Sequence, residues 1–250
     1  MKSRQRILIT GASSGLGRGM ALEFAARGRD LALCARRLDR LEDLRGQIAA
    51  QFPTVRVAVR ALDVTEYARI GPTFRELAAE LGELDRIIVN AGIGRGAPVG
   101  TGCFDDNLAT VNTNFVAALA QCEAAVELFK AGHGGHLVTI SSIAAIRGLP
   151  RAQTVYAATK AGLSSLTEGI RADTWGSNIR VSAILPGYIE TEILSGSRRR
   201  PFMVDAQTGC RAIVRAIERE RPTACVPGWP WAPIAMLMRH VPLGLLLRFL

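Results

Sequence analysis

Short apolar runs alternate with longer segments of mixed polarity along the whole chain. The runs are rich in Ile, Leu, Val and Ala and almost free of charge, as in strands buried on both faces. The segments between them carry apolar residues at helical spacing. This pattern predicts strands at 7–10, 30–35, 55–64, 86–90, 136–141, 179–187 and 223–227. It predicts helices at 16–27, 38–51, 67–81, 104–130 and 205–220, and one more that begins near Tyr156.

The order of these elements predicts an α/β fold. Strands that alternate with helices through short connections form a doubly wound parallel sheet, here of about seven strands, with helices on both faces. Because no linker or repeat interrupts the pattern, we expect a single domain over 1–228, with 229–250 as an apolar extension of it. Ligands bind such sheets beyond the carboxyl ends of the strands. The residues after each strand are therefore the candidates for a site.

A glycine-rich turn, TGASSGLG, follows the first strand. It contains Gly11, Ser13, Ser14, Gly15, Leu16 and Gly17. Glycines allow a tight turn and let the backbone approach a pyrophosphate, which then rests on the helix N-terminus. A plain strand–helix turn would also account for them. The turn alone leaves both interpretations open.

A tyrosine and a lysine four residues apart occur in the segment TVYAATKAGL. Positions i and i+4 share one helix face, so the Lys160 ammonium would lie beside the Tyr156 phenol. A positive charge favours the phenolate and lowers its pKa from about 10. Tyr156 is therefore a candidate general acid/base that Lys160 would tune. For an isolated pair of this kind, an exposed surface position is the alternative.

Five short motifs in register resemble the short-chain dehydrogenase/reductase family. They are TGASSGLG, Asn-Ala-Gly at 90–92, Ser-Ser at 141–142, Tyr156-x-x-x-Lys160 and Pro186-Gly187. The resemblance covers about residues 5–227. It implies a Rossmann-type domain, a nicotinamide cofactor, a small carbonyl or alcohol substrate, and homodimers or homotetramers.

The resemblance also implies roles for single residues. Ser142 matches the family's serine better than Ser141 does, and it would hydrogen-bond the substrate oxygen. Asn114, favoured over Asn112, would hold a water that connects Lys160 to solvent. Lys160 would also hold the nicotinamide ribose. The other residues expected at the cofactor are the glycine turn, Asp63, Val64, Asn90, Ala91, Gly92, Tyr156, Pro186, Gly187, Ile189 and Thr191.

Two arginines after the second strand favour NADP(H) over NAD(H). An acidic residue there would bind the ribose 2′-hydroxyl and repel a 2′-phosphate, whereas guanidinium groups suit phosphate. We expect Arg36 to be the main contact, with Arg37 beside it. A solvated basic helix start is the alternative. The family often has a further basic residue where this chain has Ser13 and Ser14.

Charge and cysteine content narrow the possible classes of function. The formal net charge is +9, but the basic residues are spread out and no nucleic-acid motif accompanies them, so we expect no nucleic-acid partner. The five cysteines form no Cys-x-x-Cys pair, which favours reduced thiols and a cytoplasmic location. His133 and His136 flank a Gly-Gly pair and are expected in a loop, with no metal site.

The last quarter of the chain is the least typical of the family. A polar loop at 192–204, with Arg198–Arg200, is expected to cover the substrate. The tail at 229–250 is apolar, but its prolines and the Arg239-His240 pair argue against a helix that spans a membrane. It would pack over the substrate cleft or a neighbouring subunit, contact a membrane peripherally, or extend the core. The first two interpretations favour a lipophilic substrate.

The resulting hypothesis is an NADP(H)-dependent enzyme that transfers a hydride between nicotinamide and a carbonyl or secondary alcohol. The alternative is a nicotinamide-binding scaffold or regulatory protein without turnover. The intact set of Ser142, Tyr156 and Lys160 argues against the alternative, because a scaffold has no need of all three.

Overall fold

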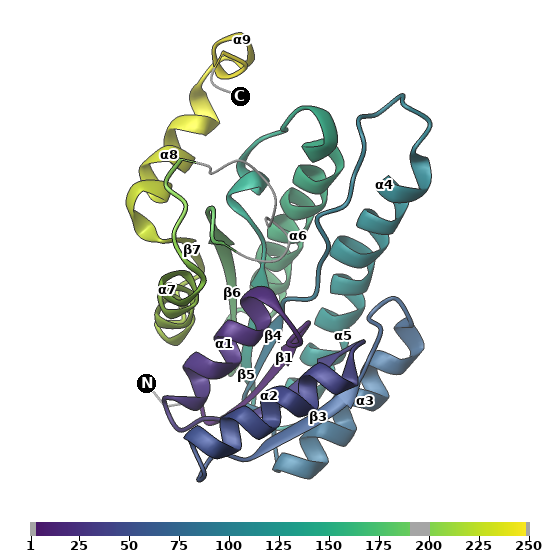
Figure 1. The fold of residues 1–250 in the computed structure, drawn as a ribbon, viewed down its shortest axis with the longest axis vertical. Helices are drawn as coiled ribbons and strands as arrows, with labels where there is room; N and C mark the ends of the chain where they lie inside the picture. Colours follow the sequence, from purple (N-terminus) through teal and green to yellow (C-terminus); the bar gives the residue numbers. More distant parts are fainter. Residues whose placement is uncertain (1–3, 191–200, 249–250) are drawn as a thin grey trace.

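The computed structural model describes residues 4–190 and 201–248 (Figure 1). The strands are β1 (Arg6–Thr10), β2 (Asp30–Ala35), β3 (Val57–Ala61), β4 (Arg86–Val89), β5 (Gly135–Ile140), β6 (Ile179–Pro186) and β7 (Thr223–Val226). The helices are α1 (Gly15–Ala25), α2 (Leu38–Gln51), α3 (Tyr67–Leu81), α4 (Phe104–Val111), α5 (Ala117–Ala131), α6 (Thr154–Asp173), α7 (Ala206–Glu218), α8 (Gly228–His240) and α9 (Leu243–Leu246). All strand pairs are parallel, in the order β3-β2-β1-β4-β5-β6-β7.

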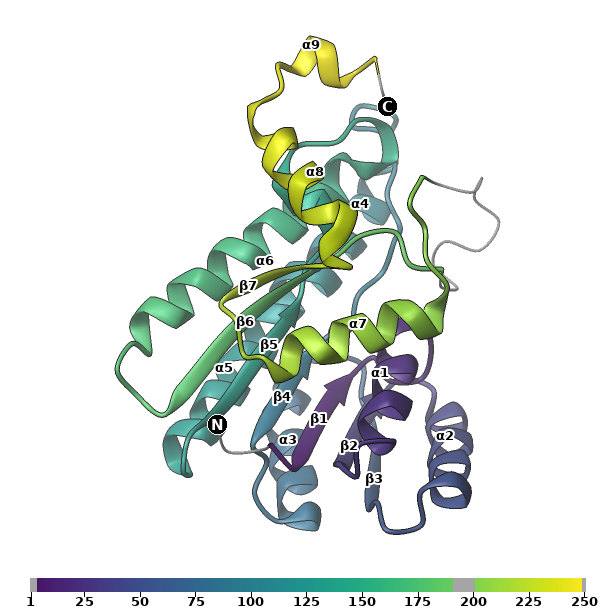
Figure 2. The same ribbon diagram turned by 90° about the vertical axis from the view of Figure 1, so that its left-hand side faces the viewer.

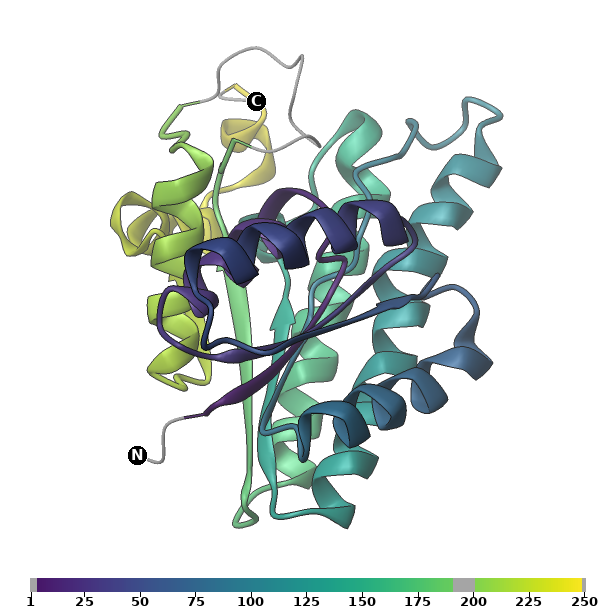
Figure 3. The same cartoon turned by 60° about the horizontal axis from the view of Figure 1, so that its bottom comes forward.

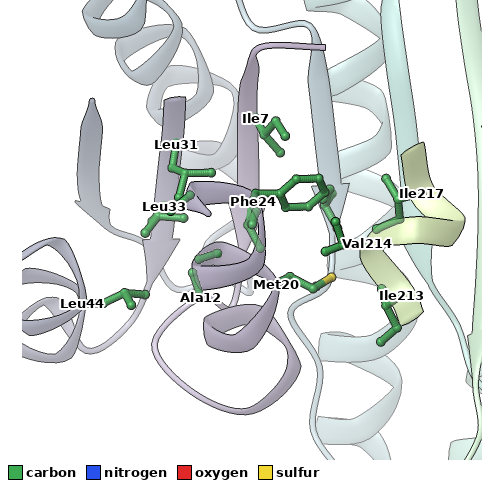
Figure 4. Packing of buried hydrophobic residues seen from close by; sticks show 14 of the residues in the cluster. Ile7, Ala12, Met20, Phe24, Leu31, Leu33, Leu44, Ile213, Val214 and Ile217 are labelled. Carbon is green, nitrogen blue, oxygen red and sulfur yellow. The ribbon is translucent and has the colours of Figure 1, made fainter. Parts of the chain in front are cut away.

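Two helical layers cover the sheet. Helices α1, α2 and α7 pack on one face, where Met20, Phe24 and Val214 lie in a single apolar cluster (Figures 2, 3 and 4). Helices α3, α5 and α6 cover the other face, with Phe74 and Phe129 among their buried side chains. The predicted fold class is confirmed. Its strand order reverses between β1 and β4, which is the position where such sheets bind ligands.

The expected helix at 104–130 is interrupted. A π-helical turn at Asn112–Val116 separates α4 from α5. The third strand also ends earlier than expected, because Asp63 accepts hydrogen bonds from the N–H and O–H of Thr65 (2.9 and 2.8 Å) and turns the chain. The spacing of apolar residues along the sequence predicts neither the π-helical turn at Asn112–Val116 nor the early end of β3.

His136 lies in the strand that the apolar run at 136–141 predicts, and not in the loop that the neighbouring glycines suggested. It lies in β5, fully buried, and its Nδ1 accepts a hydrogen bond from Nε of Arg86 at 2.9 Å. Its Nε2 bonds the Ser182 hydroxyl at 2.8 Å. Arg86 also donates to Glu220 at 3.2 Å. His133 does lie in the preceding turn. Buried polar residues thus join β4, β5 and β6 near the amino ends of the strands.

The tail forms two short helices, α8 and α9, at one end of the longest axis of the molecule (Figures 1 and 2). Short 3₁₀ turns at Ile143–Ile146 and Arg151–Gln153 lie between β5 and α6. Within residues 4–190 and 201–248, no helix has the length and apolar character needed to cross a membrane.

Candidate active site

The glycine turn joins β1 to α1 with no room for a side chain at Gly11 or Gly17. Gly11 and Gly15 have φ angles of +65° and +52°, which glycine adopts without steric cost. A Cβ on Gly17 would lie 2.2 Å from the Gly11 carbonyl oxygen. The backbone of α1 therefore contacts the turn directly.

The N-terminus of α1 is suited to an anion. The Ser14 side chain accepts no hydrogen bond from the described helix, and its first turn, which begins at Gly15, contains no acidic residue. Free backbone N–H groups and the helix dipole favour phosphate at such an end. Leu16 packs against the core below the turn. These residues fit the pyrophosphate of a dinucleotide.

The two arginines after β2 differ in their contacts. Arg37 Nη2 donates to the hydroxyls of Ser13 (3.2 Å) and Ser14 (2.9 Å), so this guanidinium reaches the glycine turn. Arg36 is exposed and forms no hydrogen bond or ion pair with the part of the chain that the structure describes. The structure thus brings Arg37 to the turn and leaves Arg36 free at the start of α2.

The segment after β4 is tied to the glycine turn. The Thr10 hydroxyl accepts hydrogen bonds from the backbone N–H groups of Asn90 (3.0 Å) and Ala91 (3.1 Å). The Asn90 side chain donates to the Thr10 carbonyl at 2.8 Å. A Cβ on Gly11 would lie 2.9 Å from Cα of Ala91. The first and fourth strands therefore end in one rigid unit.

The pair after β3 lies at the same edge of the sheet. The backbone N–H of Leu62 donates to the carbonyl oxygen of Ala35 at 2.9 Å, which keeps this segment beside the end of β2. Val64 is buried in the core and Asp63 is partly exposed. Both residues are placed where the resemblance expects contact with adenine.

Asn114 and Lys160 meet at the loop after β4. Asn114 is 1% exposed in the π-helical turn, where its Oδ1 accepts from Ile93 N (2.8 Å) and its Nδ2 donates to Ile93 O (2.9 Å). A Cβ on Gly92 would lie 3.1 Å from this Oδ1 and 3.7 Å from Nζ of Lys160. Of the two candidate asparagines, Asn114 is the buried one, and Asn112 is partly exposed.

The two serines after β5 have different partners. The Ser141 hydroxyl donates to the backbone carbonyl of Lys160 at 2.8 Å and bonds a second hydroxyl on α6, so it anchors that helix. The Ser142 hydroxyl accepts from Ala144 N at 3.1 Å. The Ser142 side chain also forms a hydrogen bond with Tyr156. Ser142 is therefore the serine that the structure brings to the tyrosine.

The pKa of the tyrosine on α6 shifts in the opposite direction to the expected one. Burial raises the pKa of the Tyr156 phenol, and the hydrogen bond with Ser142 opposes this shift only in part. Burial lowers the pKa of Lys160 from 10.5 to about 8. Its Nζ donates to the Ile140 carbonyl at 2.9 Å and lies 5.8 Å from the centre of the tyrosine ring. The expected decrease in the phenol pKa is therefore not found, because burial disfavours the charged phenolate.

The turn after β6 contacts the tail. A position over the substrate cleft was one of the expectations left open for the tail, but the residues in contact were not predicted. Pro186 ends the strand, and a Cβ on Gly187 would lie 2.1 Å from Nε1 of Trp231. The Trp231 ring packs edge-on against Tyr188, with centroids 5.1 Å apart. Met238 of the same helix packs against the apolar cluster that Tyr156 also contacts. The helical spacing of Trp231 and Met238 in the sequence could have indicated that both lie on one buried face of a tail helix.

Of the remaining expected residues, Ile189 lies within the part of the chain that the structure describes, and Thr191 does not. Ile189 is 3% exposed, and it pairs with Val204 in a parallel bridge. Thr191 lies outside the described residues, as does most of the expected substrate loop with Arg198–Arg200.

Comparison with known proteins places the chain in a family. The family model described as short chain dehydrogenase matches residues 5–201. An uncharacterized oxidoreductase of Mycobacterium tuberculosis is 51% identical over 99% of this chain and 98% of its own length. The NADP-dependent 3-hydroxy acid dehydrogenase of Schizosaccharomyces pombe is 32% identical over 74% of this chain and 72% of its own length.

A solved structure agrees with the sequence relatives. The crystal structure of a short chain dehydrogenase from Burkholderia cenocepacia in complex with NADP has a TM-score of 0.80 and 26% identity, and covers 90% of this chain and 96% of that one. The chain therefore belongs to the short-chain dehydrogenase/reductase family and is an oxidoreductase.

Proposed function

We propose that this oxidoreductase uses NADP(H) to reduce a lipophilic carbonyl compound, or to oxidise the corresponding secondary alcohol, with Tyr156 as general acid/base. One observation carries the proposal. Side chains from three separate segments, Ser142, Asn114 and the pair on α6, converge beside the loop after β4. A chain without turnover has no need for such convergence.

The cofactor side of the proposal rests on the glycine turn and the arginines. The open N-terminus of α1 would hold the pyrophosphate, and Asp63 and Val64 would border the adenine. Arg37, held at the glycine turn, and the free Arg36 would bind a 2′-phosphate. Pro186, Gly187, Ile189 and Thr191 would border the nicotinamide. When bound, the nicotinamide supplies or accepts the hydride.

Tyr156 would donate the proton to the substrate oxygen during reduction. Its raised pKa keeps the phenol protonated at neutral pH, as a proton donor must be. The Ser142 hydroxyl, which already bonds this phenol, would hydrogen-bond the same oxygen as negative charge develops on it. A phenol that is protonated at neutral pH is the form that carbonyl reduction requires.

Lys160 and Asn114 would supply the next proton. With a pKa of about 8, the ammonium can exchange a proton near neutral pH, while the Ile140 carbonyl holds its Nζ in place. Asn114 Oδ1 lies on the same side of Gly92 and has a second lone pair available for water. The pair would return a proton from solvent to the phenol after each turnover.

The apolar surroundings of the tyrosine favour a lipophilic substrate. Leu149, Ala157 and Met238 form one cluster with Tyr156. A second cluster beside it contains Ile143 and Trp231. A lipophilic carbonyl compound would be desolvated at little cost against these side chains.

Calorimetric titration with NADPH and with NADH tests the cofactor. We expect NADPH to bind more tightly, and Arg36→Ala/Arg37→Ala to weaken NADPH binding at least about tenfold with little change for NADH, since two charge-assisted contacts are lost. Arg45→Ala, an exposed arginine further along α2, is the matched control. Equal binding of the two dinucleotides would contradict the NADP(H) assignment, and binding of neither would contradict the proposed function.

Turnover of a panel of lipophilic ketones with NADPH tests the chemistry. Tyr156→Phe removes only the phenolic hydroxyl, so it should abolish turnover and leave NADPH binding within about twofold. Substantial activity in this variant would exclude Tyr156 as the proton donor. NADPH binding without turnover of any ketone or alcohol by the native protein would favour the non-catalytic alternative.

A further inference from the structure

Helix α8 is apolar on two opposite faces. Its inner face consists of Trp231, Ile234, Ala235 and Met238, spaced as one helical stripe, and it packs on the body of the protein. Its outer face is also apolar, since Met236 is 72% exposed and Leu237 is 65% exposed. A helix that is apolar all round normally has a partner on every side. The inner face has its partner, and the outer face has none among the described residues.

The apolar surface extends beyond α8 at both ends. Trp229 precedes the helical part and is 81% exposed. On and after α9, Leu243, Leu245 and Leu247 are 55%, 45% and 50% exposed. We define these three leucines together with Trp229, Met236 and Leu237 as the outer tail face. The helices that carry it, α8 and α9, run toward one end of the long axis of the molecule (Figures 1 and 2).

The body of the protein holds α8 in this position. Arg147 Nη1 donates to the carbonyl of Met238 at 3.0 Å and also to that of Val241, which satisfies carbonyls at the end of the helix. At the other end, Trp231 is 5% exposed and contacts Gly187. The residues of the outer tail face are therefore exposed although α8 is packed firmly against the body of the protein.

The charged side chains of the tail itself have one sign. Residues 221–250 contain no Asp or Glu. The exposed Arg239, His240 and Arg248 lie among the apolar residues, and the whole chain carries a net charge of +9. An apolar surface with interspersed cations complements an anionic lipid bilayer, where apolar side chains enter the acyl boundary and arginines meet phosphates.

A second copy of the chain fits this surface less well. A twofold contact would place the cations of one copy against those of the other, with no carboxylate side chain in the tail to offset them. The exposed indole of Trp229 also suits the boundary between water and lipid. The 13 residues of α8 extend about 20 Å, well short of the roughly 30 Å of a bilayer core, so the helix would lie on the membrane.

We propose that α8 and α9 dock the protein on an anionic lipid bilayer, with the outer tail face in the acyl boundary and Arg239 and Arg248 against lipid phosphates. This goes beyond the proposed reaction and does not depend on it. Binding to lipid can be measured without substrate or dinucleotide.

Flotation of the purified full chain with vesicles tests the proposal. We expect co-flotation with phosphatidylcholine vesicles that contain phosphatidylglycerol, and much less with phosphatidylcholine alone. Trp229→Glu/Met236→Glu should weaken partitioning at least about tenfold, because each change replaces buried apolar area with a charge. Arg239→Gln/Arg248→Gln should lose about fivefold per arginine on the anionic vesicles only.

Trp175 provides a matched control. It is 85% exposed, close to the value for Trp229, but follows α6 on the side of the sheet where the strands begin. Trp175→Glu should leave vesicle binding within about twofold, since the same chemical change falls outside the outer tail face.

Three results would overturn the proposal. The first is the absence of binding to either kind of vesicle. The second is equal binding by the wild type and Trp229→Glu/Met236→Glu, since docking would then occur elsewhere. The third is a concentration-dependent dimer, seen by sedimentation, that Trp229→Glu abolishes in a protein without vesicle binding. That dimer would make the outer tail face a contact between copies of the chain.

Discussion

Acidification below about pH 6.5 should destabilise the fold through one buried imidazole, that of His136. The ring is fully buried, and its Nδ1 accepts the Arg86 hydrogen bond, so the neutral form carries its proton on Nε2, which faces Ser182. Burial, with Arg86 and Arg4 nearby, holds the pKa of His136 well below 6.5. Protonation would place a second cation against a guanidinium inside the sheet.

The direction and size of the effect follow from linkage. The folded-state pKa lies below the unfolded value of about 6.5, so the unfolded chain binds the extra proton as the pH falls. The free energy of unfolding therefore decreases below that pH, with a limiting slope of about 1.4 kcal/mol per pH unit. Integration from neutral pH to about pH 5 gives a loss of about 2 kcal/mol. This is a substantial part of a typical stability of about 5–15 kcal/mol.

Urea unfolding, followed by circular dichroism between about pH 7.5 and pH 5, measures this loss before most carboxyl groups titrate. His136→Gln keeps an acceptor for Arg86 and a donor for Ser182, and it should remove about 2 kcal/mol of the pH dependence whatever its absolute stability. The control is His240→Gln, an exposed position at the end of α8 that should leave the slope unchanged. An unchanged slope in His136→Gln would refute the assignment of the effect to this ring.

Three further predictions concern the site. Gly17→Ala places a Cβ 2.2 Å from the Gly11 carbonyl, so it should cost about 1–3 kcal/mol of unfolding free energy and abolish NADPH binding by calorimetry. Ser142→Ala should lower kcat about 10²–10³-fold and cost about 1 kcal/mol of unfolding free energy, because its hydroxyl also accepts a hydrogen bond from Ala144 N. Ser141→Ala, which removes the anchor of α6, should cost about 1–3 kcal/mol in urea and less in kcat. The reverse pattern in kcat would mean that the roles of the two serines are exchanged. Burial lowers the pKa of Lys160 from 10.5 to about 8, so the unfolded chain binds more protons than the folded one between these two pH values. The free energy of unfolding of the wild type should therefore rise above pH 8, relative to that of Lys160→Met, by up to about 1.4 kcal/mol per pH unit. A pH-independent difference in urea unfolding would contradict that shift.

The fold class and the order of the elements could be predicted from the sequence, because most segments of this chain match either the strand or the helix pattern of apolar residues and not both. The run at 30–35, for example, became β2 with the predicted bounds, since a continuous apolar run has no exposed face to misplace. The apolar run at 136–141 placed His136 in a strand, but the flanking glycines suggested a loop, and that second inference was wrong. The burial of this histidine depends on Arg86 and Ser182, which lie far away in sequence and meet it only in the folded sheet.

The candidate site was predictable to the extent that its residues form short local motifs. Ser142, Tyr156 and Lys160 were found by spacing, and the structure brings them together. The raised pKa of Tyr156 was not predictable, because spacing specifies a neighbouring charge but not the depth of burial. Nor was the packing of Met238 beside the tyrosine, since that contact depends on where α8 docks.

The absence of a side chain at Gly187 determines whether the C-terminal helix can be exchanged between related proteins. The Trp231 indole occupies the space that a Cβ at that position would need. A relative with alanine or any larger residue there could not accept this tail without displacing the helix or the end of β6. Anyone who grafts the tail onto another enzyme, or replaces it, must therefore change both positions together. The C-terminal segment and the end of β6 therefore have to be exchanged or redesigned together.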